Sequence, residues 1–378
     1  MNTKDKKKIF IIAGESSGDQ HGADYIQKHL SSDENILFTA IGQDEIKKLP
    51  VNLIYNSEKI SVVGISEVIS KFREIKNALN IAKKHIDEHK PDLVVLIDYI
   101  EFNTKIAKYA KNKNIPVLFY IAPQVWAWRE KRTKNFIKYI DHLAVVFPFE
   151  NIFFKKYTAN VSFVGHPIAD NNSLKINMIN YENRNIDLGI FPGSRESEIK
   201  NNIYTMLDCI QKNKNENIKI FYANKSSRDI LLKLLPSDYH SLLESGKNKA
   251  MVGNCKKALC ASGTITLELA MLNIPMVIMY KLSFISYLIM KSLVKIKYIG
   301  LVNLILGDKL GSEAFIKEFI QPNYSDQVDI MVELNKLDND HEYRSNILNK
   351  FREVREKLQG GAANNLANIA GKMLAASE

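Results

Sequence analysis

The sequence has few of the residues that mark disulfide scaffolds, collagens or disordered chains. Its 378 residues include three cysteines, Cys209, Cys255 and Cys260, and no CxxC pair. Neither a disulfide framework nor a cysteine zinc site is expected, and reduced thiols favour a cytoplasmic protein. Only 10 prolines and 17 glycines stand beside 46% apolar residues, so the composition is that of an ordinary globular protein.

Long apolar runs are also scarce. The run Ile9 to Ala13 near the start is too short for the core of a signal peptide. Residues 258–280 carry a single charge, Glu268, but residues 262–264 predict a turn and residues 273–275 a helix stop. We therefore expect strand, helix and strand in a buried core there, and no membrane span.

Basic residues exceed acidic ones, 52 against 42, for a formal net charge of +10. Such an excess suits an anionic partner, either a nucleotide, a phospholipid surface or a nucleic acid. Many of the lysines stand in Lys/Asn/Ile-rich stretches, so compositional drift explains part of the excess equally well.

Short β-branched runs alternate with helical patterns, which predicts repeated βαβ units and an α/β doubly wound sheet. In the first half the expected strands are Ile9–Ala13, Leu93–Ile97, Val117–Ile121 and Leu143–Phe147, with helices over Lys71–His89 and Asn103–Asn112 among them. After the polar passage 170–185 come Leu188–Phe191, Ile218–Ala223, Ala258–Ala261 and Met276–Met279.

Two Rossmann-like domains are the natural interpretation of this pattern. We place an N-terminal domain at residues 1–168 and a C-terminal one at 169–345. Residues 346–378 are expected to form helices that pack across the domains or onto a partner subunit. Ligands of such sheets bind beyond the carboxyl ends of the strands, so the turns after the strands are the ones to inspect.

Two turns of the first half carry polar groups. In AGESSGDQHG the glycines are four apart, which fits neither the GxGxxG nor the GxxxxGK[ST] pattern, so NAD and ATP are not supported. The turn around Ser17 could receive an anion, or could be a plain turn with Asp19 as the helix N-cap. Asp98 directly follows a strand and is placed either to act as a general base or to cap the next helix.

A third turn, IAPQVWAWREKR, contains both tryptophans of the chain, Trp126 and Trp128, beside Arg129, Lys131 and Arg132. Aromatic rings beside cations suit a sugar, a phosphate or a lipid headgroup. Packing of Trp126 in the core is the alternative.

Two turns of the second half suit a diphosphate. Gly193 and Ser194 form a turn before Arg195, whose guanidinium can bind a phosphate or lie exposed beside a helix cap. Residues 262–264 open a helix, and Glu268 lies one turn further on. A carboxylate in so apolar a helix needs a partner, either ribose hydroxyls or a structural salt bridge.

The segments AGESSGD, IAPQVWAWRE, FVGHPIAD, FPGSRESEI and ASGTITLE, in this order, resemble the lipid-A-disaccharide synthases over about residues 9–310. The resemblance implies two Rossmann-like domains facing each other across a cleft, as in inverting GT-B glycosyltransferases. It also implies transfer of 2,3-diacylglucosamine from UDP-2,3-diacylglucosamine to 2,3-diacylglucosamine 1-phosphate, giving a β-1,6 disaccharide and UDP, with no metal and no cofactor.

The same resemblance assigns roles to individual residues. Asp98 would be the general base. The other substrate residues would be Glu15, Ser17, Gly18, Asn103, Trp126 and Asn303, and UDP would be held by Gly193, Ser194, Arg195, Ser262, Gly263, Thr264 and Glu268. The family pattern is altered at Ile100, Glu101 and Val302, where a proline, an aspartate and a proline are usual, which puts the loop geometry and the acceptor preference in question.

The acylated substrates imply a cytoplasmic protein that associates peripherally with the inner membrane, without nucleic acid and with a homodimer as one possible state. Two segments, Val62–Ile75 and Lys281–Lys297, place apolar residues beside lysines and could contact the membrane or pack inward. The alternatives in function are another UDP-sugar transferase, a UDP-sugar epimerase, and a nucleotide-sugar-binding relative without catalysis.

Overall fold

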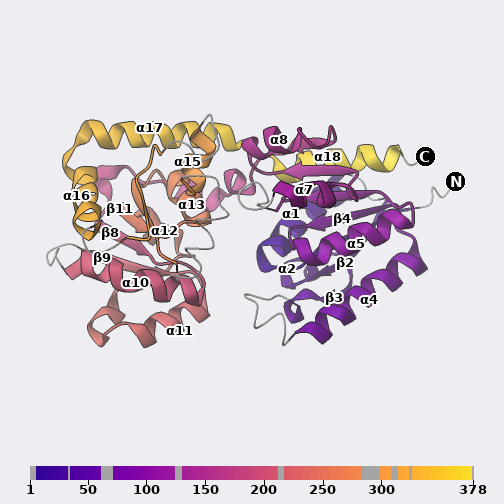
Figure 1. Ribbon diagram of the computed structural model, residues 1–378, viewed down its shortest axis with the longest axis horizontal. Helices are drawn as coiled ribbons and strands as arrows, with labels where there is room; N and C mark the ends of the chain where they lie inside the picture. Colours follow the sequence, from indigo (N-terminus) through magenta and orange to yellow (C-terminus); the bar gives the residue numbers. More distant parts are fainter. Residues whose placement is uncertain are drawn as a thin grey trace. The chain divides into compact units, whose positions relative to one another are not determined.

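The computed structural model describes residues 6–32, 35–60, 71–123, 130–211, 217–282, 298–307, 314–322 and 326–376. Contacts within the chain divide it into two units. One unit comprises Met1–Asp170 with Gln359–Glu378, and the other comprises Asn171–Leu358. Each unit is built around its own parallel sheet (Figure 1). Within the described residues, no helix is long and apolar enough to span a membrane.

The first unit contains a seven-stranded sheet in the order β3-β2-β1-β4-β5-β6-β7. Its strands are β1 (Lys7–Ala13), β2 (Ile36–Gly42), β3 (Asn52–Asn56), β4 (Leu93–Ile97), β5 (Val117–Tyr120), β6 (His142–Val145) and β7 (Val161–Phe163). Its helices are α1 (Ser16–Ser32), α2 (Asp44–Lys47), α4 (Phe72–His89), α5 (Ile100–Asn112), α7 (Glu130–Ile137), α8 (Pro148–Phe154) and α18 (Ala362–Ala375). Every residue of β4 is buried, as expected of a central parallel strand that helices cover on both faces.

The second unit contains a six-stranded sheet in the order β10-β9-β8-β11-β12-β13. Its strands are β8 (Ile186–Phe191), β9 (Ile218–Tyr222), β10 (Leu243–Ser245), β11 (Cys255–Cys260), β12 (Met276–Tyr280) and β13 (Glu318–Ile320). Its helices are α9 (Asn172–Ile176), α10 (Glu196–Gln211), α11 (Lys225–Leu234), α12 (Lys249–Gly253), α13 (Thr264–Met271), α15 (Leu301–Leu306), α16 (Asp326–Asn339) and α17 (His341–Leu358).

In both sheets the order in which successive strands are added reverses beside the first strand, between β1 and β4 and between β8 and β11. This is the Rossmann strand order, and the point of reversal is where such sheets bind ligands. The predicted fold class, two Rossmann-like doubly wound domains, is confirmed.

The C-terminal helices belong to different units. Helix α17 packs on α13, α15 and α16 in the second unit, whereas α18 packs on α1 in the first (Figure 1). The Asp170 carboxylate accepts hydrogen bonds from the Gly361 N–H at 2.8 and 2.9 Å, which fixes the start of α18. Gly361 has a φ of +84°, a conformation that suits glycine.

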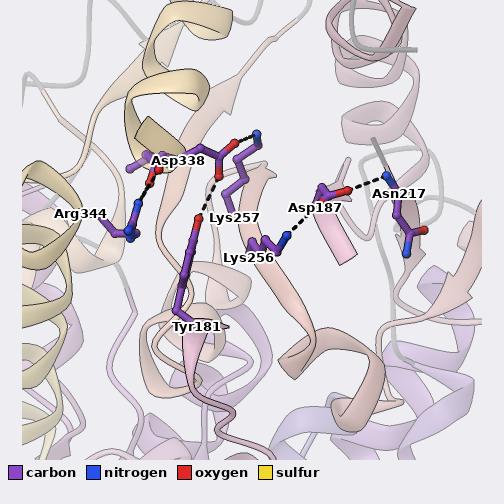
Figure 2. Close-up of polar contacts among 8 residues, drawn as sticks. Tyr181, Asp187, Asn217, Lys256, Lys257, Asp338 and Arg344 are labelled. Atoms are coloured by element: carbon purple, nitrogen blue, oxygen red, sulfur yellow. Dashed lines mark hydrogen bonds and ion pairs between the residues drawn. The ribbon is translucent and has the colours of Figure 1, made fainter. Parts of the chain in front are cut away.

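The amino-terminal edge of the second sheet is occupied by ion pairs (Figure 2). The wholly buried side chain of Lys257 in β11 pairs with Asp338 of α16, which also accepts from the Tyr181 hydroxyl at 3.0 Å. Beside it, Lys256 pairs with Asp187 of β8 at 2.8 Å. These contacts tie α16 and two central strands together at the edge opposite to the strand carboxyl ends.

Candidate functional site

In the first unit, the carboxyl ends of β4 and β5 carry unusual backbone conformations. Asp98 and Tyr99 both have a φ of +47°, and Ile121 has a φ of +65°. Ile121 is β-branched, and such a residue rarely adopts a positive φ. Backbone strain of this kind concentrates at functional sites. The Asp98 N–H donates to the Tyr120 carbonyl at 2.9 Å, so the two strained turns are hydrogen-bonded neighbours.

The Asp98 carboxyl group sits in this strained turn and is largely removed from water. Burial, and to a smaller extent the negative charge of Glu15, raises its pKa to about 6. A carboxylate with a pKa of about 6 is ionised at neutral pH yet is a stronger base than an exposed aspartate, which suits proton abstraction. Helix α5 has Tyr99 as its N-cap and no side-chain cap bond, so the alternative of Asp98 as a helix cap is wrong.

Two neighbours hold the Asp98 turn in place. The buried Asn103 amide donates to the carbonyl oxygens of Ile97 at 3.1 Å and Asp98 at 2.7 Å. The Tyr99 ring packs on Gly14, where a Cβ atom would lie 2.2 Å from the ring. Asn103 therefore fixes the backbone conformation at Asp98 and makes no hydrogen bond to its carboxylate. The ring of Tyr99, a residue not among the predicted site residues, explains why the turn after β1 begins with glycine.

The remaining candidates after β1 lie on or next to α1. Glu15 is half-buried and Ser17 is exposed. Gly18 lies against the end of β4, where a Cβ atom added to it would be 3.6 Å from Ile97 Cγ2, an ordinary contact distance. Asp19 accepts from the N–H groups of Gln43 at 2.6 Å and Glu45 at 2.8 Å, so it caps the turn before α2. The alternative of Asp19 as the N-cap of α1 is wrong, because α1 already begins at Ser16.

Several predicted residues lie outside the described part of the chain. These are Trp126, Trp128 and Arg129, most of the Val62–Ile75 segment, and all of the Lys281–Lys297 segment beyond Leu282. For Lys131 and Arg132 the structure gives only their helical backbone in α7.

In the second unit, the turn from β11 to α13 is open. Gly263 is the N-cap of α13 with a φ of +150°, and a Cβ atom added there would meet no described atom within 4 Å. The first amide groups of a helix have no partner within the helix and carry the positive end of its dipole. This turn can thus bind an anion through the backbone amide groups of Ser262, Gly263 and Thr264.

The turn from β8 to α10 is arranged differently. The amide groups of Ser194 and Arg195 already donate to the Glu198 carboxylate, at 3.1 and 3.3 Å. Gly193 has a φ of +122°, and a Cβ atom there would lie 2.7 Å from Glu198 Cβ. The Arg195 guanidinium is 65% exposed and 3.7 Å from Glu198, so it is the guanidinium rather than these amides that is available to a ligand.

Glu268 lies on α13 and forms a salt bridge. Its Oε2 accepts from Lys249 Nζ at 2.5 Å, and Lys249 also donates to the Gly246 carbonyl at 2.7 Å. Both partners of the pair are partly buried. Of the two partners expected for Glu268, the structural salt bridge is therefore present, and binding of ribose by Glu268 stays a prediction.

Asn303 of α15 is buried and its amide is fully engaged. It donates to the Ile316 carbonyl at 2.8 Å and to Glu318 at 2.6 Å, and accepts from the Phe315 and Ile316 N–H groups. Glu318, which sequence reasoning missed, accepts in turn from the Ile299 and Gly300 N–H groups, each at 2.9 Å. The Ser262 hydroxyl lies 3.5 Å from the Ile299 carbonyl, so any influence of Asn303 on this site is exerted through the backbone before α15.

No group of three or more His, Cys, Asp or Glu side chains that could hold a metal ion occurs among the described residues. The groups available to a ligand in the first unit are led by the Asp98 carboxylate. In the second unit they are the start of α13, the Arg195 guanidinium and the Glu268 carboxylate.

Comparison with solved structures supports the same fold. A UDP-GlcNAc 2-epimerase from Neisseria meningitidis bound to UDP-GlcNAc superposes with a TM-score of 0.61, at 13% identity, over 97% of this chain and 100% of that one. The glycotransferase of kitacinnamycin superposes with a TM-score of 0.62, at 11% identity, over 97% and 98% of the two chains. At these identities the likeness concerns the fold alone.

Sequence comparison is more specific. The family described as lipid-A-disaccharide synthetase matches residues 9–372. The lipid-A-disaccharide synthases of Coxiella burnetii (strain CbuK_Q154) and Geobacter metallireducens are each 34% identical to this chain, over 97% and 99% of its length respectively and 99% of their own. The five sequence segments, the paired Rossmann-like units and these matches agree, and the chain belongs to the lipid-A-disaccharide synthase family of glycosyltransferases.

Proposed function

We propose that this protein transfers 2,3-diacylglucosamine from UDP-2,3-diacylglucosamine to the 6-hydroxyl of 2,3-diacylglucosamine 1-phosphate, forming a β-1,6 disaccharide and releasing UDP. Membership of the family supports the reaction. The observation that supports catalysis by this chain is the Asp98 carboxyl group, partly buried in a strained turn with its pKa raised to about 6. Carboxyl groups with a pKa raised in this way are concentrated at active sites.

In this mechanism the Asp98 carboxylate accepts the proton of the acceptor hydroxyl as its oxygen attacks the anomeric carbon of the donor. The bond from that carbon to the UDP oxygen breaks on the opposite face, so the configuration inverts. The departing diphosphate gains negative charge, which the start of α13 and the Arg195 guanidinium would stabilise. Glu268 would accept hydrogen bonds from the ribose.

We also propose that the protein works in the cytoplasm, associated peripherally with the inner membrane, because both substrates carry acyl chains. Peripheral association with a bilayer rests on apolar contact and on attraction between basic residues and anionic lipid. The net charge of +10 favours that attraction. A homodimer is compatible with this proposal.

Replacing the base should separate catalysis from binding. Asp98→Asn keeps the size of the side chain but removes its basicity, and a positioned base contributes about 10²- to 10⁴-fold. We expect release of UDP from the two acylated substrates to slow on that scale, while UDP affinity stays unchanged. Because the pKa of Asp98 is raised from 3.8 to about 6, its ionisation costs folding free energy that builds up between these pH values and is complete at pH 7. The variant, which cannot ionise, should therefore be no less stable at pH 7. Normal turnover would exclude Asp98 as the base and direct attention to Glu101 and Glu15.

The pH profile should reflect the acidic neighbour of Asp98. With the pKa of Asp98 at about 6, kcat/KM should rise as the pH increases through about 6. Glu15→Gln removes a negative charge that disfavours ionisation, so the midpoint should move to lower pH. It should stay above the value of an exposed aspartate, because burial is the larger cause. An unchanged or higher midpoint would contradict this account of the carboxyl pair.

The nucleotide assignment predicts a loss of UDP affinity in the second unit. Arg195→Ala should weaken UDP binding by about 1 to 3 kcal/mol, the range for a hydrogen bond to a charged group. The matched control is Lys200→Ala, which removes an exposed cation of α10 that pairs with Glu196 at 2.5 Å. Calorimetric titration with UDP measures both. Equal affinities for the Arg195 variant and the wild type would refute the assigned role of this arginine.

A further inference from the structure

Lys249 is a residue to which the proposed mechanism gives no role. It is the first residue of α12, on the chain segment that follows the edge strand β10, and its ammonium group reaches Glu268 of α13 at 2.5 Å. The side chains of Lys249 and Glu268 are only 15% and 26% exposed. A second bond, from the Lys249 ammonium group to the Gly246 carbonyl at 2.7 Å, restricts the position of the charge.

The pair lies next to the start of α13, where the proposed function requires a diphosphate. An ionised Glu268 by itself would repel that diphosphate, and partial burial strengthens the repulsion because the surroundings screen it less than water does. Lys249 supplies the opposite charge at the carboxylate itself. It engages Oε2, and among the described residues no hydrogen bond is made to Oε1, which leaves Oε1 as an acceptor for a hydroxyl group.

We propose that Lys249 is a positioning residue of the nucleotide site, which orients the Glu268 carboxylate for the ribose and cancels its charge beside the diphosphate. The inference rests on the proposed UDP site but adds a residue that no sequence pattern singled out. It predicts that Lys249 acts through Glu268, so the effects of changing the two residues must depend on each other.

A double-mutant cycle tests this interdependence by calorimetric titration of UDP and of uridine into the full-length protein. The variants are Lys249→Met, Glu268→Gln and the double variant. Lys256→Met is the matched control, because it removes a partly buried ion pair with Asp187 in the same sheet but at the amino-terminal edge (Figure 2). Thermal unfolding of each variant verifies that it is folded, and Lys249→Arg keeps the charge should Lys249→Met fail to fold.

Lys249→Met should weaken UDP binding roughly tenfold or more, the scale of losing a charged hydrogen bond. The loss should be smaller for uridine, which has no diphosphate to be repelled. Glu268→Gln should cost affinity in the wild-type background but no further affinity when Lys249 is already Met. Lys256→Met should bind UDP like the wild type, and Lys249→Arg should bind UDP more tightly than Lys249→Met.

Three results would overturn the inference while leaving the nucleotide site intact. They are wild-type UDP affinity in Lys249→Met, losses that multiply in the double variant, and an equal loss in Lys256→Met. If the wild type binds UDP but Glu268→Gln does so equally well, the assignment of ribose to Glu268 fails, and the role of Lys249 fails with it. Absence of UDP binding by the wild type would instead refute the proposed function.

Discussion

Parallel strands covered by helices on both faces all end along one edge of their sheet, and this constraint decides which residues of the chain can meet a ligand. In the first unit that edge carries Asp98, held at positive φ beside Glu15. In the second it carries the open helix start at Gly263 and the exposed Arg195. The opposite edge of the second sheet is filled by the Lys256 and Lys257 ion pairs, which join β11 to β8 and α16 (Figure 2).

Acidic residues at these edges have contrasting surroundings. Asp98 lies near a second acid and away from water, and both effects raise its pKa. Glu268 and Glu198 instead lie beside the cations Lys249 and Arg195. The contrast matches the two tasks that the proposed reaction requires. A general base benefits from a raised pKa, whereas an acid beside a diphosphate benefits from a counterion.

The sequence predicted the central part of this fold well and its periphery poorly. Leu93–Ile97 is a strand with the predicted bounds, because a strand buried on both faces is a continuous apolar run. The short strands β7, β10 and β13 were not foreseen, since three residues give no measurable periodicity. Strand β2 alternates buried and exposed residues at its start, and it was missed beside the stronger patterns around it.

For the site, the sequence placed groups at strand ends but could not show their partners. The packing of Tyr99 on Gly14 and the salt bridge of Lys249 with Glu268 join residues far apart in the chain. Glu198 was foreseeable, because an acid at the third position of a helix commonly binds the free amides of the preceding turn. The hydrogen bonds of the Asn303 amide were not foreseeable, since its partners lie in and just before β13, a strand that was not predicted.

The decisive measurement is the position of bound UDP in a crystal structure of this protein. We expect the diphosphate within hydrogen-bond distance of the backbone at Gly263 and Thr264 and of the Arg195 guanidinium, with a ribose hydroxyl on Glu268 Oε1. UDP bound at the turn after β1, or ribose placed away from Glu268, would contradict the division of roles between the two units.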